Sequence, residues 1–204
     1  MKRYLLILFI ILFVHSCTPV VHNFNHQSIK CPLYYGQSIQ HKISVSTFAY
    51  NPPGNGTIGQ NEITVTGSLD SLMKGYSSLL FDNKISNIVS NEIEKALQSS
   101  GIEISEETKC LLSGEVFLLN FSSFSAHTIS DIKYVLKNDS DQILFEARLK
   151  IKHNTGVSEL DHERKIIEIG KVDQLLAISI HKNVYKLLSM NTFIDALSKC
   201  SCNE

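Results

Sequence analysis

The sequence predicts an α+β fold in two layers, in which a mostly antiparallel sheet carries two long amphipathic helices packed on one face. Two observations predict the helices, because apolar residues recur at helical spacing over 82–100 and again over 172–188. A third observation predicts the sheet: segments in which apolar and polar residues alternate precede and separate these helices. Placing both helices on one face of the sheet buries their apolar stripes in a single core.

The first 17 residues have the pattern of an exported, lipid-modified protein. Lys2 and Arg3 precede an unbroken apolar run over 4–14, which is shorter than the roughly 20 residues that span a bilayer as a helix. The run ends in VHSC, which resembles a bacterial lipobox. This resemblance implies cleavage before Cys17 and attachment of lipid to its thiol, so that residues 1–16 form the signal peptide. The alternative is an ordinary signal peptide with an incidental cysteine.

The composition after cleavage is that of one globular domain with a tether. The mature chain keeps 204 minus 16, or 188, residues, which is long enough to bury a core without obligatory disulfides. The whole chain has 19 basic and 20 acidic residues, and loss of Lys2 and Arg3 leaves 17 against 20, a net charge of −3. Because no basic excess remains to follow a phosphate backbone, we expect no nucleic-acid partner. No motif calls for a cofactor.

Four cysteines remain besides the one in the lipobox, namely Cys31, Cys110, Cys200 and Cys202. In an oxidising compartment an even number favours disulfides, and four cysteines allow three pairings among which the sequence does not choose. The alternative is a metal site in which Cys200 and Cys202 supply two thiolates. Structural zinc needs two further ligands at close spacing, and the sequence has none there. We therefore expect disulfides or free thiols, and no metal.

Residues 17–41 are expected to form the lipid anchor and a flexible tether. The segment is polar, contains Pro19 and Pro32, and has no regular pattern. By random-coil scaling, about 23 such residues hold the domain roughly 25 Å from the lipid. His22 and His26 are four residues apart, a spacing that suits a metal on a helix, but without a helical pattern we expect solvated side chains.

The single domain is expected to span 42–199 and to begin with two strands. Residues 43–48 and 62–66 alternate between apolar and polar side chains, and the turn-rich segment 51–61 joins them. This arrangement predicts a hairpin with a long tip. The segment 68–80 has no clear pattern.

The first helix is expected over 82–100, with Asp82 as its N-cap and Gly101 just beyond its end. Its apolar stripe, which we expect to pack onto the core, consists of Ile85, Ile88, Val89, Ile93, Ala96 and Leu97. A short strand is expected over 102–105. The segment 109–120 contains VFLL, which is apolar on both faces and predicts a central, covered strand.

The second half of the domain predicts a hairpin followed by a helix. Residues 132–136 and 145–151 alternate between apolar and charged side chains on either side of an NDSD turn, which predicts an antiparallel pair with one wet face. A further edge strand is considered over 165–169. The closing helix packs its stripe onto the core through Val172, Leu175, Leu176, Ile180, Val184, Leu187 and Leu188. Residues 200–204 are expected to form a short tail.

Three short motifs match catalytic or nucleotide-binding patterns but lack the required context. Residues 54–59, GNGTIG, fit G-x-G-x-x-G, yet a strand-like run follows instead of a helix, and no kinase motif occurs downstream. Ser71 and Lys74 fit the S-x-x-K pattern of penicillin-binding enzymes without its companion motifs. The DHE at 161–163 is expected to be a charged, solvated turn. We therefore assign no catalytic residue.

The order of elements resembles that of the YajG-like lipoproteins and, more loosely, of the auxiliary lipoproteins of envelope ABC transport systems. The resemblance is carried by Cys17, by ISVSTFAYNPP at 43–53, by NIVSNEIEKALQSSGIEI at 87–104, by LLSGEVFLLNF at 111–121 and by the closing helix. The neuraminyllactose-binding haemagglutinin lipoprotein is similar in layout. The resemblance implies a non-enzymatic module at the outer membrane, and Thr18 after the lipid cysteine, in place of Asp, implies sorting to that membrane.

Three hypotheses of function follow from these observations. The first is a lipid-anchored accessory or assembly module on the periplasmic side of the outer membrane, which contacts an envelope protein through a sheet edge or through the 51–61 tip. The second is a surface-exposed adhesin or antigen. The third is a cell-wall hydrolase whose site is assembled from distant residues and so escapes motif matching.

Overall fold

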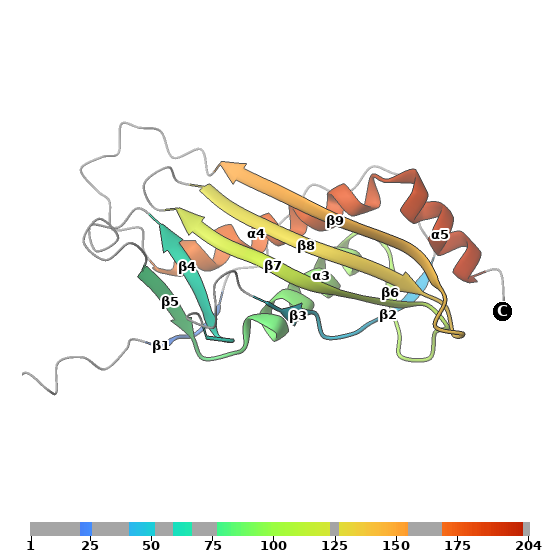
Figure 1. The fold of residues 1–204 in the computed structure, drawn as a ribbon, viewed down its shortest axis with the longest axis horizontal. Coiled ribbons are helices and arrows are strands. Elements are labelled where there is room, and N and C mark those ends of the chain that lie inside the picture. The colour runs from blue at the N-terminus through green and yellow to red at the C-terminus, as the bar shows by residue number, and fades with distance from the viewer. Residues whose placement is uncertain are drawn as a thin grey trace, which may run out of the picture.

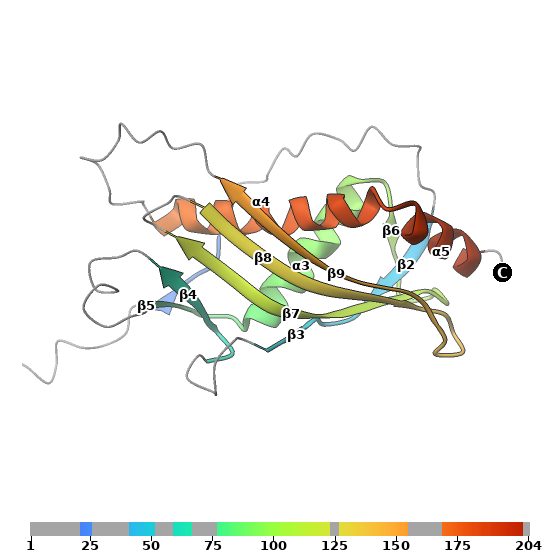
Figure 2. The same ribbon diagram turned by 45° about the horizontal axis from the view of Figure 1, so that its top comes forward.

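The computed structural model describes residues 21–25, 41–51, 59–66, 77–122, 127–154 and 169–201. These residues form a mixed β-sheet and three helices, which confirms the predicted α+β class. Figures 1 and 2 show the helices α3 and α4 along one face of the sheet, with α5 at one end. Within the described part of the chain, none of the helices combines the length and apolarity needed to cross a membrane.

Three long antiparallel strands form the main body of the sheet. They are β7 (Leu111–Ser122), β8 (His127–Lys137) and β9 (Ile143–Asn154), with β8 in the middle. The predicted hairpin is confirmed and is longer than its alternating core, because pairing continues as far as His127 with Asn154. The prediction of a central strand is also confirmed, since β7 pairs with β8 on one edge and with shorter strands on the other.

The shorter strands follow one another along the second edge of β7. β2 (Lys42–Val45), β3 (Ala49–Tyr50) and β4 (Glu62–Thr66) all run parallel to β7. β2 also pairs with β6 (Glu103–Ile104), and β4 pairs antiparallel with β5 (Ser77–Phe81).

The predicted hairpin between 43–48 and 62–66 is therefore wrong. Ser44 is in register with Leu111 and Thr64 with Asn120, so both strands run in the same direction along β7. Alternation identifies a strand but not its partner. Both short strands pair with backbone groups along one side of the long strand β7.

The N-terminal segment 21–25 is part of the folded domain. β1 (Val21–His22) adds to β5 in parallel, with Val21 opposite Leu80. The structure thus differs from the predicted tether over 17–41, since two strand residues and one aromatic side chain suffice to dock a polar segment. His26 lies outside the described residues, so the structure does not show where it lies relative to His22.

The helices are α3 (Ile85–Ser99), α4 (Ile169–Leu188) and α5 (Asn191–Ser201). The first two confirm the predicted helices, and α4 includes Ile169, which was considered for an edge strand; 155–168 lie outside the described residues. α5 was not predicted, and it takes Cys200 out of the expected tail. Its buried face has helical spacing and consists of Phe193, Ala196, Leu197 and Cys200.

The ends of α3 differ in how well they were predicted. Asp82 is not the N-cap, because the helix begins after Lys84, whose side chain makes no capping hydrogen bond. The N–H of Ile85 instead donates to the Gln60 carbonyl at 2.9 Å, so a tertiary contact satisfies the first turn. Gly101 has φ of 88°, which confirms it as the left-handed residue that ends the helix.

The core lies between the sheet and the helices, and it is tightest around Gly114 of β7. Phe48 and Tyr134 pack edge to face there, with ring centroids 5.7 Å apart, and both are fully buried. A Cβ on Gly114 would overlap the Lys133 carbonyl oxygen and the Phe48 ring. Glycine is thus required at this position because of close approach.

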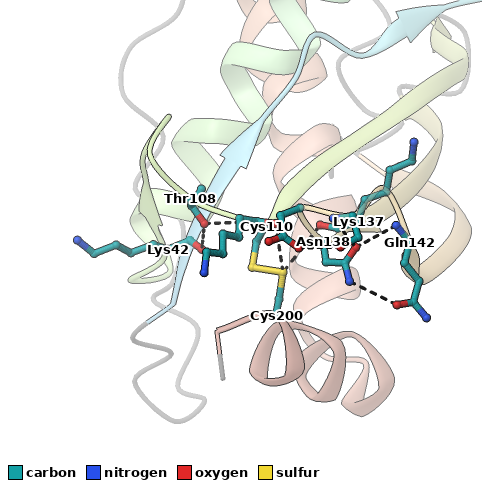
Figure 3. Close-up of a disulfide and its surroundings, with 10 residues drawn as sticks. Lys42, Thr108, Cys110, Lys137, Asn138, Gln142 and Cys200 are labelled. Atoms are coloured by element: carbon teal, nitrogen blue, oxygen red, sulfur yellow. Dashed lines mark hydrogen bonds between the residues drawn. A yellow bond between two sulfur atoms is a disulfide. The ribbon is translucent and has the colours of Figure 1, made fainter. Parts of the chain in front are cut away.

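A disulfide joins Cys110, just before β7, to Cys200 in the last turn of α5 (Figure 3). The two Cα atoms are 5.8 Å apart and 90 residues separate them in sequence. This pairing leaves Cys200 unavailable as a thiolate for the alternative metal site. Cys31 and Cys202 lie outside the described residues.

Candidate binding surface

Most residues that the sequence singled out for chemistry lie outside the described residues. This applies to Cys17, to Ser71 and Lys74, to the DHE at 161–163, and to all of the GNGTIG motif except Gly59. Among the described residues, no group of three His, Cys, Asp or Glu side chains could hold a metal ion.

The exposed face of β8 and β9 carries a row of charged side chains centred on Arg148. Its Nε and Nη2 atoms donate to the two carboxylate oxygens of Asp131 at 2.8 and 2.9 Å. The guanidinium carbon also lies 3.9 Å from the centre of the Phe117 ring. The hydrogen bond to Asp131 raises the pKa of Arg148, so this residue stays charged at every physiological pH. A rigid cation therefore marks the middle of this face.

The other charges on this face differ in whether they are paired. Lys133 forms an ion pair with Glu146 at 2.9 Å, across the two strands. Lys150 and Lys152 are exposed toward the end of β9 and have no acidic partner within the described part of the chain. The C-terminal half of β9 is consequently cationic.

β9 is also an edge strand. Within the described residues its only strand partner is β8, so the side of its backbone that faces away from β8 has no sheet partner there. Such an edge can accept an extended segment of another protein by strand addition. Lysines on it also hinder association with identical edges. We refer to β9 with the exposed Glu146, Arg148, Lys150 and Lys152 as the β9 edge.

Buried polar side chains occur where α4 packs on the sheet. The hydroxyls of Ser130 and Ser179 are 3.0 Å apart, and the Asn183 Nδ2 donates to the Leu149 carbonyl at 2.9 Å. The side chains of Ser130, Ser179 and Asn183 are completely buried, and their hydrogen bonds connect α4 to β8 and β9. The sequence analysis did not predict these side chains. The available signal was that the polar residues Ser179 and Asn183 are four residues apart on the apolar stripe of α4.

A buried hydrogen bond between two titratable side chains links α3 to α4. The His181 Nε2 lies 3.1 Å from the Glu92 Oε2, and the Lys95 Nζ lies 2.7 Å from the other oxygen of Glu92. The side chains of His181 and Glu92 are 6% and 1% exposed, which leaves no surface for a substrate. We therefore interpret this group as holding the two helices together.

His153, near the end of the β9 edge, offers a test of the local electrostatics. Its Nδ1 lies 2.7 Å from the Lys182 Nζ, and burial, followed by the charge of Lys182, lowers the pKa of His153 below its ordinary value of 6.5. We expect an NMR titration to place its midpoint below 6.5 and Lys182→Met to move it upward. As the pH falls, His153 gains its proton at a higher pH in the unfolded chain than in the folded protein, because its pKa is lowered by folding. His153 should therefore reduce the free energy of unfolding as the pH falls below 6.5. A midpoint that Lys182→Met leaves unchanged would contradict the assignment.

Comparison with known proteins shows a likeness of fold. No protein-family model and no curated protein matches the sequence. A solved protein of Xanthomonas campestris from the family DUF330 is similar, with a TM-score of 0.57 and 8% identity over 88% of this chain and 99% of that one. A second, uncharacterised protein has a TM-score of 0.50 and 10% identity over 82% and 97% of the two chains.

These likenesses concern fold alone, because the identities are low. The resemblance to YajG-like lipoproteins receives no support from a family model or a curated relative. What the comparisons do support is a structural relation to bacterial proteins of uncharacterised function, and they indicate no enzyme family.

Proposed function

We propose that the mature chain is a lipid-anchored, non-enzymatic accessory module of the bacterial outer membrane, on its periplasmic side. The single observation that carries the proposal is the N-terminal sequence, in which a basic pair, an apolar run too short to span a bilayer and VHSC lead to Cys17. Lipid on this thiol would be the contact with the membrane. One acyl chain anchors only marginally, so firm residence requires two or more.

The β9 edge is the surface that we propose for an envelope protein partner. Its backbone offers hydrogen-bonding groups along twelve residues, and strand addition draws its affinity from such groups. Lys150 and Lys152, which have no acidic partner among the described residues, favour a partner segment that carries acidic residues. The Ser130–Ser179 and Glu92–His181 groups are buried, so neither presents a reactive side chain to a substrate. This burial supports a role in binding rather than in catalysis.

Replacing the lipidated thiol should release the protein from the membrane. We expect Cys17→Ser, expressed in a Gram-negative host, to remain uncleaved and to lack acyl chains by intact mass, because lipoprotein processing requires the thiol. Cys31→Ser is the matched control and should be processed normally. A photoreactive residue in place of Lys150 should capture a discrete envelope protein in cells that express the Cys31→Ser variant. The same residue should capture no such protein in cells that express the Cys17→Ser variant. Cleavage and acylation of Cys17→Ser would refute the proposed anchor.

A further inference from the structure

The docked segment 21–25 begins only four residues after Cys17. On the basis of the proposed lipidation, we propose that this segment holds one defined end of the domain against the lipid surface. This proximal end consists of the described residues at the ends of five strands: 64–66, 77–79, 119–122, 127–130 and 151–154. The registers of Val65 with Ser77, Thr66 with Ser122, and His127 with both Ser122 and Asn154 bring these residues together.

The direction of β1 and its distance from the lipid support this orientation. β1 runs parallel to β5, so the chain enters it from the Ser77 side, at the end opposite to α5 in Figure 1. Four residues reach at most about 14 Å. β7, with twelve residues, is about 36 Å long. A lipid on Cys17 can therefore reach the proximal end but not the β8–β9 turn at the other end.

Two contacts prevent the segment from swinging freely. The Phe24 ring packs edge to face on Phe81, with centroids 5.9 Å apart. The N–H of Asn25 donates to the Oδ2 of Asp173 at 2.8 Å, and Asp173 is completely buried. Since Phe81 ends β5 and Asp173 belongs to α4, the segment is attached to both layers of the domain. The expected separation of roughly 25 Å by a flexible tether is replaced by direct docking.

The chemistry of the distal end argues against its contact with a lipid surface. Val21, which lies opposite Leu80 of β5, presents an apolar side chain that is 54% exposed. The distal end has exposed carboxylates at Glu103, Glu106, Glu107, Asp139 and Asp141. Anionic headgroups would repel these distal carboxylates.

Single tryptophans can test this orientation, because the natural chain contains none. We would place Ser78→Trp at the proximal end and Ile143→Trp at the distal end, two exposed positions, in the full lipidated protein on phosphatidylglycerol-containing vesicles. Brominated phospholipid in the vesicles should quench Ser78→Trp and leave Ile143→Trp unchanged. Adding Phe24→Ala should abolish the quenching of Ser78→Trp while the protein still sediments with vesicles and keeps its circular dichroism spectrum.

The outcomes separate this inference from the proposed function. Sedimentation without quenching of Ser78→Trp, or equal quenching at both positions, would overturn the orientation and leave the anchor intact. Quenching that survives Phe24→Ala would show that the docked segment does not set the orientation. Failure to sediment, together with a mass that lacks acyl chains, would refute the anchor itself and the orientation with it.

Discussion

Replacing both Cys110 and Cys200 by serine is expected to lower the free energy of unfolding by roughly 4–5 kcal/mol. The bridge closes a loop of 90 residues that contains β7, β8, β9 and α4. In the chain-entropy account, a cross-link over such a long loop removes much of the freedom of the unfolded chain. Urea unfolding of the double variant and of the parent protein measures this difference, when the free energy of unfolding of each is extrapolated to zero urea with its own slope.

The neighbouring cysteine provides the matched control for this experiment. Cys202→Ser changes a residue two positions beyond Cys200 and should leave the urea midpoint within experimental error of the parent. Peptide mapping under non-reducing conditions should recover Cys110 and Cys200 in one fragment. A double variant as stable as the parent would refute the bridge, as would a fragment that joins Cys200 to another cysteine.

Gly114→Ala is expected to cost at least about 3 kcal/mol, the upper end of the range for overpacked cores. The added methyl group would overlap the backbone carbonyl of Lys133 on the adjacent strand, and a backbone atom cannot rotate away as a side chain can. The fully buried Phe48 ring blocks movement in the other direction. Either β7 separates from β8 locally or the variant fails to fold, and thermal or urea unfolding measures the loss.

Gly59→Ala is the control for the effect of adding a methyl group. A Cβ there would meet only side-chain atoms of Asn61 and Glu62, at 3.3 Å and beyond, and these can move. We expect a change within about 1 kcal/mol of zero, because the loss of chain freedom in the unfolded state offsets a mild contact. Similar losses for Gly114→Ala and Gly59→Ala would mean that the approach of β7 to Lys133 is not the cause.

Local periodicity was sufficient to predict the elements whose partners are close in sequence. The stripe from Val172 to Leu188 predicted α4, and the alternation on both sides of the 138–141 turn predicted the β8–β9 hairpin. Gly101 was predicted as the end of α3, because a left-handed residue is a local requirement. In each case the determining interactions lie within a few residues, where a pattern in the sequence can record them.

The errors concern interactions between residues that are distant in sequence. β2 and β4 pair with β7 rather than with each other, and alternation carries no information on that choice. The start of α3 depends on the Gln60 carbonyl and not on Asp82. α5 was missed because its eleven residues carry only a short stripe, which is buried against the distant strands β8 and β9.

The candidate site was predictable to the same extent. Cys17 could be proposed as the lipid site because the resemblance to a lipobox is carried by a contiguous motif, and an accessible sheet edge was anticipated in general terms. The identity of that edge as β9 required the sheet order, and the pairing of Cys110 with Cys200 required two segments to meet across the core. The Glu92–His181 pair gave no signal, since each residue alone has the appearance of a solvated helix position.

The position of β7 as partner of β2, β3, β4 and β8 also has a consequence for the proposed export of the chain. β2, β3 and β4 cannot complete their pairing until residues 111–122 are present, and the hydrogen bond from Asn25 requires Asp173, which is 148 residues away in the sequence. Contacts over such long separations delay folding. If the chain is exported from its N-terminus, as we propose, its first strands cannot complete their pairing until most of the chain has crossed the membrane, which keeps the chain extended during transport.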